Sequence, residues 1–313
     1  MPHTALPPCA PALPVGLTVL ERGWLSSNNI LIQGADNAAL IDSGYCLHAP
    51  QTLALIDATL QGKPLTLLLN THLHSDHCGG NAALQAACPR LQTWIPPGLS
   101  QHVSHWNPTA LSYTPTGQSC PQFRFDAVLQ PGTELRLGDL PWQIHAAPGH
   151  DPHSVILFEP VSRTLVSADA LWERGFGVVF PELDGDDAFD EVSDTLDLIE
   201  NLQPLMVIPG HGRPFADVAQ ALAVARQRLD GFLRDPQRHV QYAAKVMLKF
   251  KLLEARQMAR AELLAWAHGT RYLDAMFARL FADLPFAQGL EQLVQELVRA
   301  GAATWHDGVL HNA

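Results

Sequence analysis

The stretch THLHSDHCGG, residues 71–80, places three histidines and one aspartate within the six positions 72–77, directly after the apolar run 65–69. Side chains two positions apart on an extended segment project to the same side, so His72 and His74 can bind one metal ion. Asp76 and His77 lie where the chain is expected to turn into a helix, and they point elsewhere. The spacing therefore predicts a metal site with room for a second ion.

Metal binding has to be weighed against the ordinary roles of histidine. The chain contains 15 histidines, and a lone histidine is commonly a core or surface residue with hydrogen-bond partners. Four donor groups in six positions are different, because burying so many unpaired polar groups would cost several kcal/mol. Three further apolar runs end in a histidine or an aspartate, namely His150, Asp169 and His211. This repetition predicts one shared site at neighbouring strand ends.

Composition and charge limit the class of protein. With 313 residues, 47% of them hydrophobic and 16% charged, the chain can bury a large core and exceeds one average domain. The net charge is −11, and the segment up to residue 230 holds 10 basic and 23 acidic residues, against 10 and 8 in the remainder. An acidic body repels phosphate backbones, so we expect a small-molecule substrate and disfavour nucleic acid.

The compartment is predicted from features that the sequence lacks. Residues 1–17 contain no positively charged segment followed by a long apolar stretch, and we expect no signal peptide. No apolar run reaches the roughly 20 residues of a membrane-spanning helix. Five widely spaced cysteines without a CxxC motif indicate reduced thiols. The prediction is a cytoplasmic protein without membrane contact, in which Cys78 is a small buried residue, with a reactive thiol as the alternative.

Apolar β-rich runs alternate with helical patterns from residue 17 to about 229, which is typical of an α/β domain. An amphipathic helix is expected over 189–199, where Phe189, Val192, Leu196 and Ile199 share one face. Residues 101–122 show no clear period and are expected to form a long loop. Strands are expected at 29–33, 38–42, 65–70, 142–145, 154–158, 164–167 and 205–208.

The last part of the chain is mainly helical. Helices are expected over 242–254, 257–268, 272–281 and 290–300, and Asp307-Gly308 between short apolar runs predicts a two-residue hairpin. The division is therefore a catalytic domain over 1–234 and a small winged-helix-like domain over 235–313. We find no helix crowded with Arg, Asn or Gln that would read nucleic acid, so packing or homodimer contact is the favoured role.

The ordered motif HxHxDH at 72–77, followed by His150, Asp169 and His211, resembles that of the metallo-β-lactamase superfamily. The resemblance implies a four-layer αββα sandwich over about 17–229. The aspartate of IDSGY, Asp42, corresponds to a family residue that supports the motif loop, with a simple turn residue as the alternative. Carried over by position, the pattern implies a first metal bound by His72, His74 and His150, a second bound by Asp76, His77 and His211, and Asp169 as the bridge.

Nitrogen and carboxylate donors without cysteine suit two Zn²⁺ ions, with Mn²⁺ or Fe as alternatives. The family chemistry implies a hydroxide between the metals that attacks a carbonyl carbon, with Asp76 orienting it. An aspartate at Asp169 resembles glyoxalase II and the lactonases, which favours hydrolysis of a thioester or ester of a small acyl compound. The winged-helix-like tail resembles that of the superfamily branch named β-lactamase-like protein 2, which includes ribonucleases. The alternatives are therefore a lactonase, a ribonuclease of that branch, and a persulfide dioxygenase with one iron bound by His72, His150 and Asp169.

Several residues near the motif are further candidates. His153 in GHDPHS could donate a proton or form a pocket wall, and Tyr45 could stabilise an oxyanion. Arg174 could hold a substrate carboxylate or phosphate, or form a surface salt bridge. The remaining candidates for substrate contact are Phe176 on the segment after Asp169 and, in the 101–122 segment, His102, His105 and Trp106.

Overall fold

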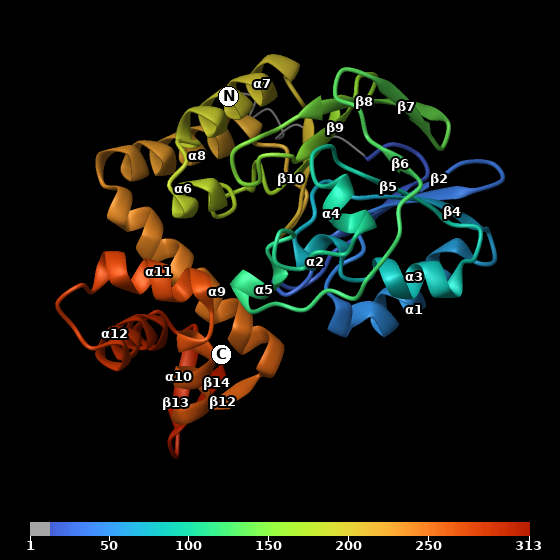
Figure 1. Ribbon diagram of the computed structural model, residues 1–313. Coiled ribbons are helices and arrows are strands. Elements are labelled where there is room, and N and C mark those ends of the chain that lie inside the picture. The colour runs from blue at the N-terminus through green and yellow to red at the C-terminus, as the bar shows by residue number, and fades with distance from the viewer. Residues whose placement is uncertain (1–12) are drawn as a thin grey trace, which may run out of the picture.

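The computed structural model describes residues 13–313, and two β-sheets form the centre of its larger part (Figure 1). The first sheet has the strand order β1-β2-β3-β4-β5-β6. The pairs β1-β2 and β2-β3 are antiparallel, whereas β3 to β6 run parallel. Its strands are β1 (Leu17–Leu20), β2 (Asn29–Gln33), β3 (Ala38–Ile41), β4 (Leu65–Leu69), β5 (Gln92–Ile95) and β6 (Ala127–Val128).

The second sheet has the order β11-β10-β9-β8-β7, and only the pair β10-β11 is parallel. The two sheets pack face to face through one hydrophobic cluster, in which Ile41 and Leu69 of the first sheet meet Trp142 and Leu157 of the second. The strands are β7 (Glu134–Leu137), β8 (Leu140–Ala146), β9 (Val155–Glu159), β10 (Thr164–Ala168) and β11 (Met206–Pro209).

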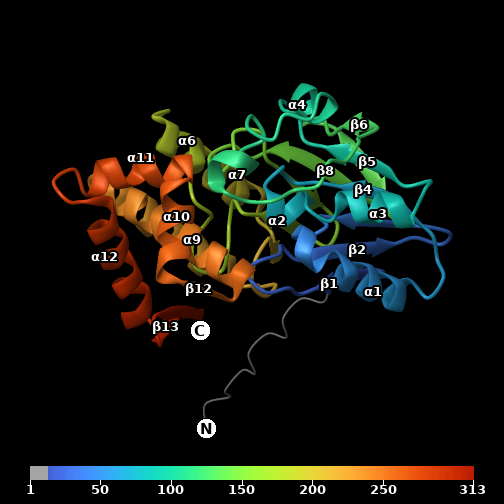
Figure 2. The same ribbon diagram turned by 60° about the horizontal axis from the view of Figure 1, so that its bottom comes forward.

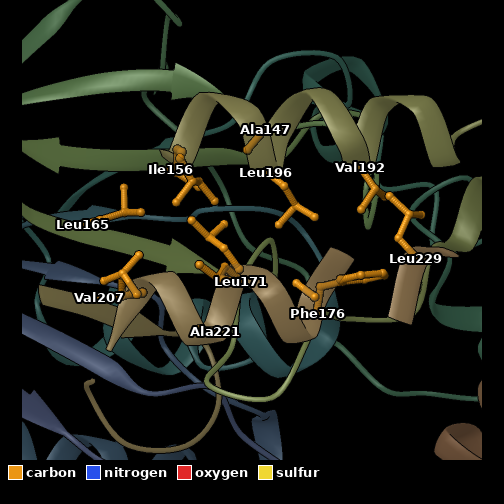
Figure 3. Packing of buried hydrophobic residues seen from close by; sticks show 14 of the residues in the cluster. Ala147, Ile156, Leu165, Leu171, Phe176, Val192, Leu196, Val207, Ala221 and Leu229 are labelled. Carbon is orange, nitrogen blue, oxygen red and sulfur yellow. The ribbon is translucent and has the colours of Figure 1, made fainter. Parts of the chain in front are cut away.

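Helices cover the outer face of each sheet. The first sheet is covered by α1 (Ala49–Leu60) and α3 (Asn81–Ala87), and the second by α7 (Phe189–Leu202) and α8 (Val218–Arg234). Figure 3 shows the helices that cover the second sheet, where Val192 and Leu196 of α7 and Leu229 of α8 pack near Leu165 and Val207 of the sheet. The predicted αββα sandwich is thereby confirmed, as is the amphipathic helix that begins at residue 189.

The predicted strands are all present, with ends displaced by at most two residues. The prediction of one long loop over 101–122 is wrong, because this segment contains α4 (Ser100–Ser104) and α5 (Tyr113–Thr116). Val103, Leu111 and Tyr113 anchor both short helices in a hydrophobic cluster of their own. Short helical turns of this kind carry too little periodicity to be recognised in sequence. Three further short elements are η1 (Cys46–His48), α2 (Ser75–Cys78) and α6 (Phe180–Asp184).

The C-terminal region lies to one side of the sandwich and has its own core (Figure 2). The predicted helix 257–268 is wrong at its first three residues, because they form a strand that pairs with β14. The predicted hairpin is confirmed: Asp307 and Gly308 have φ of 49° and 77°, as a type I′ turn requires. The elements are α9 (Pro236–Ala255), β12 (Gln257–Ala259), α10 (Arg260–His268), α11 (Arg271–Leu280), α12 (Phe286–Arg299), β13 (Ala303–His306) and β14 (Val309–Asn312).

Within residues 13–313, none of the helices combines the length and the apolar character that crossing a membrane requires. The expectation about a signal peptide concerns residues 1–17, most of which lie outside the described part of the chain, as does Cys9.

Candidate metal centre

The candidate ligands all follow strand ends on one edge of the sandwich. His72 and His74 come after β4, and Asp76 and His77 lie in the short helix α2. His150 follows β8, Asp169 follows β10 and His211 follows β11. Gly210, between the end of β11 and His211, leaves space for the Asp169 carboxylate and the His77 ring that a Cβ atom would take.

Donor atoms of these seven residues gather in three overlapping groups, and within each group the atoms lie within 4.8 Å of one another. Asp169 Oδ1 lies 3.5 Å from His77 Nε2, and its Oδ2 lies 3.5 Å from His150 Nε2. The structure thus places Asp169 between histidines from different strand ends. The groups are His72, His74 and His150; His72, His77 and Asp169; and Asp76, His77 and His211.

Unpaired nitrogen atoms test whether a metal fits this cluster. Within the described chain, His72 Nε2, His77 Nε2 and His211 Nδ1 are buried and have no hydrogen-bond partner. A buried polar atom left without a partner costs about 1–3 kcal/mol. A metal ion among the carboxylates and imidazoles would accept the free lone pairs of His72 and His77. The residues therefore fit a divalent cation that prefers nitrogen and oxygen ligands.

Neighbouring groups orient the histidine rings. Asp42 Oδ2 accepts hydrogen bonds from His77 Nδ1 and Thr71 Oγ1, both at 2.8 Å, and its Oδ1 accepts one from the Thr71 backbone N–H at 2.9 Å. His150 Nδ1 donates to the Val178 carbonyl oxygen at 2.5 Å. Both contacts keep the proton on Nδ1, so that Nε2 presents its lone pair to the site.

The protonation of the cluster favours cation binding. Burial, together with the nearby rings of His77 and His74, holds the pKa of His72 well below its usual range, and burial lowers the pKa of His150 to about 4. Burial also acts on His77, but Asp169 and Asp42 outweigh it and raise the pKa of His77 well above its ordinary value. The carboxylates thus attract a positive charge, which a metal ion would supply in place of the His77 proton.

Aromatic side chains enclose a small cavity of about 90 Å³ at these ligands. Trp24 stacks on His211 with ring centroids 5.3 Å apart and an interplanar angle of 8°. Trp172 Nε1 donates to Asp169 Oδ1 at 3.1 Å and so positions that carboxylate. Neither tryptophan was predicted from the sequence. Trp172 follows the strand-end aspartate by three positions and could have been noticed, whereas nothing in the sequence connects Trp24 with His211.

Two of the residues proposed from sequence lie away from the cavity. Tyr45 is fully buried, and its hydroxyl donates to Glu254 Oε1 at 2.6 Å and accepts a hydrogen bond from the Ser119 N–H at 3.1 Å. The oxyanion role is wrong, because this hydroxyl is already engaged outside the metal cavity. Substrate contact by Phe176 is also wrong, since its ring is 1% exposed in the core that joins α7, α8 and the second sheet.

The 101–122 segment contacts the cavity with residues other than those expected. His102 and His105 are exposed, and Trp106 packs on Tyr113 and Phe123. In the described chain, none of these three residues lines the metal cavity, so the predicted contacts are wrong. The residues of this segment that do line it are Ser112, Thr116 and Gln118.

The other candidates lie near the metal cavity but not in it. His153 lines a neighbouring cavity beside His74. Arg174 is exposed and lines a larger cleft next to the metal cavity. The Cys78 thiol is fully buried, 3.9 Å from the sulfur of Cys120, and burial raises its pKa well above the ordinary value. A buried neutral thiol agrees with the structural role expected for Cys78.

The αββα sandwich with clustered histidine and aspartate ligands at its edge defines a class of metalloproteins. Residues 22–211 match the family model described as the metallo-beta-lactamase superfamily, and the chain belongs to that superfamily. The predicted resemblance is thereby confirmed. The match ends at His211, the last of the candidate ligands.

Individual relatives match different shares of the chain. The probable metallo-hydrolase YybB of Bacillus subtilis is 26% identical over 205 residues, 65% of this chain and 86% of that protein. A hydroxyacylglutathione hydrolase of Anaeromyxobacter dehalogenans is 31% identical over 195 residues, and the alignment spans 62% of this chain and 64% of that protein. The structure of a beta-lactamase domain protein from Burkholderia ambifaria, 21% identical, covers 99% of this chain and 97% of that chain with a TM-score of 0.60. That fold therefore includes the C-terminal region.

Proposed function

We propose that this chain is a metal-dependent hydrolase of an ester or thioester, and that it works with two divalent ions, most suitably zinc. The observation that carries the proposal is the cluster of five histidines and two aspartates whose donor atoms meet in overlapping groups at a small cavity. The relative named as a hydroxyacylglutathione hydrolase supports a thioester, and the relative named as a probable metallo-hydrolase supports hydrolysis in general.

Each ligand would have a defined part in that reaction. His72, His74 and His150 would hold one ion, Asp76, His77 and His211 the other, and Asp169 would lie between them. When bound, two such ions lower the pKa of water and polarise a carbonyl oxygen. In the reaction, water adds across the acyl–sulfur or acyl–oxygen bond, so that the acyl group takes the hydroxyl and the leaving group takes the proton.

Asp76 is the group best placed to handle that proton. Its side chain is 14% exposed, and its Oδ2 lies 3.1 Å from His211 Nε2. Burial would raise the pKa of Asp76, but His77 and His211 outweigh it and lower the pKa, so the carboxylate is ionised at neutral pH. An ionised carboxylate at the cavity wall can accept a proton from water and return it to the leaving group.

Metal content and turnover test the proposal together. Protein purified without added metal or chelator is expected to carry close to two zinc ions per chain by mass spectrometry. The zinc-loaded protein is then compared on thioester, ester, lactone and RNA substrates. Asp76→Ala should lower kcat by about a hundredfold or more on the substrate that is turned over, because it removes both a ligand of the second ion and the general base. Asp57→Ala is the control, since Asp57 is exposed on α1, remote from the ligands.

Three results would contradict the proposal. A single iron per chain would indicate oxidation chemistry instead, and folded protein that binds no metal would exclude both. Turnover that survives Asp76→Ala unchanged would show that another group or a contaminant is responsible.

A further inference from the structure

A second, larger cavity adjoins the metal centre. It is a cleft of about 600 Å³ between the sandwich and the C-terminal helices, within the range of about 300–1,000 Å³ found for small-molecule sites. The cleft and the small metal cavity share five lining residues: Trp24, Trp172, His211, Val246 and Phe250. The small cavity has room for a reacting group only. A ligand that reacts at the metals can therefore extend directly into the cleft.

One wall of the cleft is a single stripe of the helix α9. Val246, Phe250 and Leu253 follow one another at intervals of four and three residues, and so lie on one face of the helix. Leu297 of α12 adds to this apolar wall, and Trp24, which is 56% exposed, lies on the other side. Exposed aromatic and aliphatic surface concentrated in a cleft is typical of a ligand site.

Asn28 holds the opposite side of the cleft in place. Its side-chain Nδ2 donates to the carbonyl oxygens of Pro209 at 3.0 Å and Gly212 at 2.7 Å. These bonds tie the loop that carries Trp24 to the end of β11, where His211 lies. The apolar wall and the metal ligand are thus parts of one connected surface.

The charge of the cleft is opposite to that of the whole protein. Five basic side chains and two acidic ones line it, although the chain has a net charge of −11. Lys245 is neutralised by Glu296 at 3.0 Å. Arg228 donates to the carbonyl oxygens of Phe176 at 3.1 Å and Arg174 at 2.8 Å, and lies 5.2 Å from the centre of the Tyr242 ring.

Arg174 remains available to an anion, whereas the terminal nitrogens of Arg228 already donate to carbonyl oxygens, so that Arg228 adds positive charge beside it. In the part of the chain that the structure describes, neither forms an ion pair with a carboxylate, and Arg174 is exposed. Guanidinium groups bind carboxylates and phosphates through paired hydrogen bonds. A positive cleft on an acidic protein attracts anions and repels cations.

We infer that the cleft binds the non-reacting end of the substrate, and that this end is an apolar chain that terminates in a carboxylate or phosphate. The chain lies along the apolar wall of the cleft, the anionic group lies at Arg174, and the ester or thioester carbonyl lies at the metal ligands. This inference rests on the proposed function for the bond that is broken. It assigns substrate selection to α9.

Acetyl thioesters of mercapto acids test the inference. In these compounds the acetyl group is attached to the sulfur, and the leaving thiol carries an alkyl chain with an anionic group at its far end. With zinc-loaded protein, kcat/KM is expected to rise at least tenfold from the mercaptopropionate to the mercaptooctanoate thioester, since each fully buried methylene contributes roughly fourfold. The mercaptooctyl phosphate thioester and the uncharged mercaptooctanol thioester complete the set. Both anions should be preferred over the neutral compound by about tenfold, and the faster anion identifies the group that the cleft accepts.

Two pairs of variants separate the cleft from general effects. Leu253→Glu should abolish the chain-length preference, whereas Leu233→Glu, at a leucine 51% exposed on α8, should retain it. Arg174→Glu should abolish the preference for anions. Arg90→Glu changes the net charge equally at an exposed position outside the cleft and should not.

Calorimetric titration with octyl phosphate, octanoate and octanol keeps the inference testable without turnover. Anions that bind wild type and lose affinity in Leu253→Glu and Arg174→Glu support the inference, even if no thioester is hydrolysed and the proposed function fails. Thioester hydrolysis with the same kcat/KM for every chain length and charge would leave the hydrolase intact and overturn the inference. Anion binding that is unchanged in both variants would also overturn it.

Discussion

Replacing Asp42 by asparagine tests how one hydrogen bond prepares the metal centre. In the native protein Asp42 Oδ2 accepts the proton of His77 Nδ1 at 2.8 Å, and Oδ1 accepts the Thr71 backbone N–H at 2.9 Å. An asparagine oxygen can keep the hydrogen bond with Thr71, but its amide group then faces His77 Nδ1 and cannot accept a proton. The imidazole would carry its proton on Nε2 instead. That proton occupies the position where a metal would bind.

The expected cost follows from removing the hydrogen bond between His77 and Asp42. Losing a group that orients a metal-bound histidine lowers metal affinity about 10–100-fold, or about 1.4–2.8 kcal/mol. In metal-free protein, the loss of one buried hydrogen bond to a carboxylate should lower the free energy of unfolding by about 1.5–3 kcal/mol. Chelator competition measures the first quantity and urea denaturation the second.

Asp57→Asn is the matched control, because it removes the same charge from an exposed position on α1. It should change neither metal affinity nor stability by more than about 0.5 kcal/mol. Two ions bound by Asp42→Asn with wild-type affinity would refute the view that Asp42 sets the His77 tautomer.

Two further predictions concern buried positions around the site. Burial lowers the pKa of His239 to about 4 from 6.5, and the neutral ring accepts the Val179 N–H at 3.1 Å. The stability that this neutral histidine contributes is present above pH 6.5 and is lost as the pH falls toward 4. Over this range, the free energy of unfolding of metal-free wild type, measured by urea titration, should therefore fall by about 3 kcal/mol more than that of His239→Gln. Equal decreases in both proteins would contradict this prediction. Gly210→Ala should reduce retained metal at least tenfold after dialysis, because a Cβ there overlaps the Asp169 carboxylate. Gly23→Ala, in open space, is its control, and equal metal content in both would refute the steric argument.

Local patterns accounted for most of the fold. Seven strands of the sandwich are short apolar runs, and each candidate ligand follows such a run, so both were visible within a few residues of sequence. The strands β1, β5, β6 and β7 were not predicted; β5 and β7, for example, include charged or polar residues. The Asp307-Gly308 turn was equally local, because its positive φ angles restrict the residues that fit. The prediction of helix at residues 257–259 failed for the opposite reason. These residues form β12, whose pairing partner β14 lies some fifty residues away in sequence.

The errors at the site arose where the direction of a side chain depends on distant packing. Arg174 and Phe176 are two positions apart, but the turn at Gly175, with φ of 110°, leaves the arginine exposed in the cleft while the phenylalanine enters the core. Tyr45 is engaged by Glu254, 209 residues further along the chain. Neither outcome has a signal in the neighbouring sequence.

The sequence by itself determined the positions of seven strands, the superfamily and the seven candidate metal ligands, because hydrophobic periodicity and ligand spacing are properties of nearby residues. Only the tertiary structure decided what surrounds those ligands. Val246 and Phe250 meet His211 at the cleft because α9 docks beside the sandwich, and Trp24 stacks on the same histidine because the loop before β2 is bonded to the end of β11. These contacts join segments far apart in the chain, and they depend on the fit of two surfaces that exist only after folding.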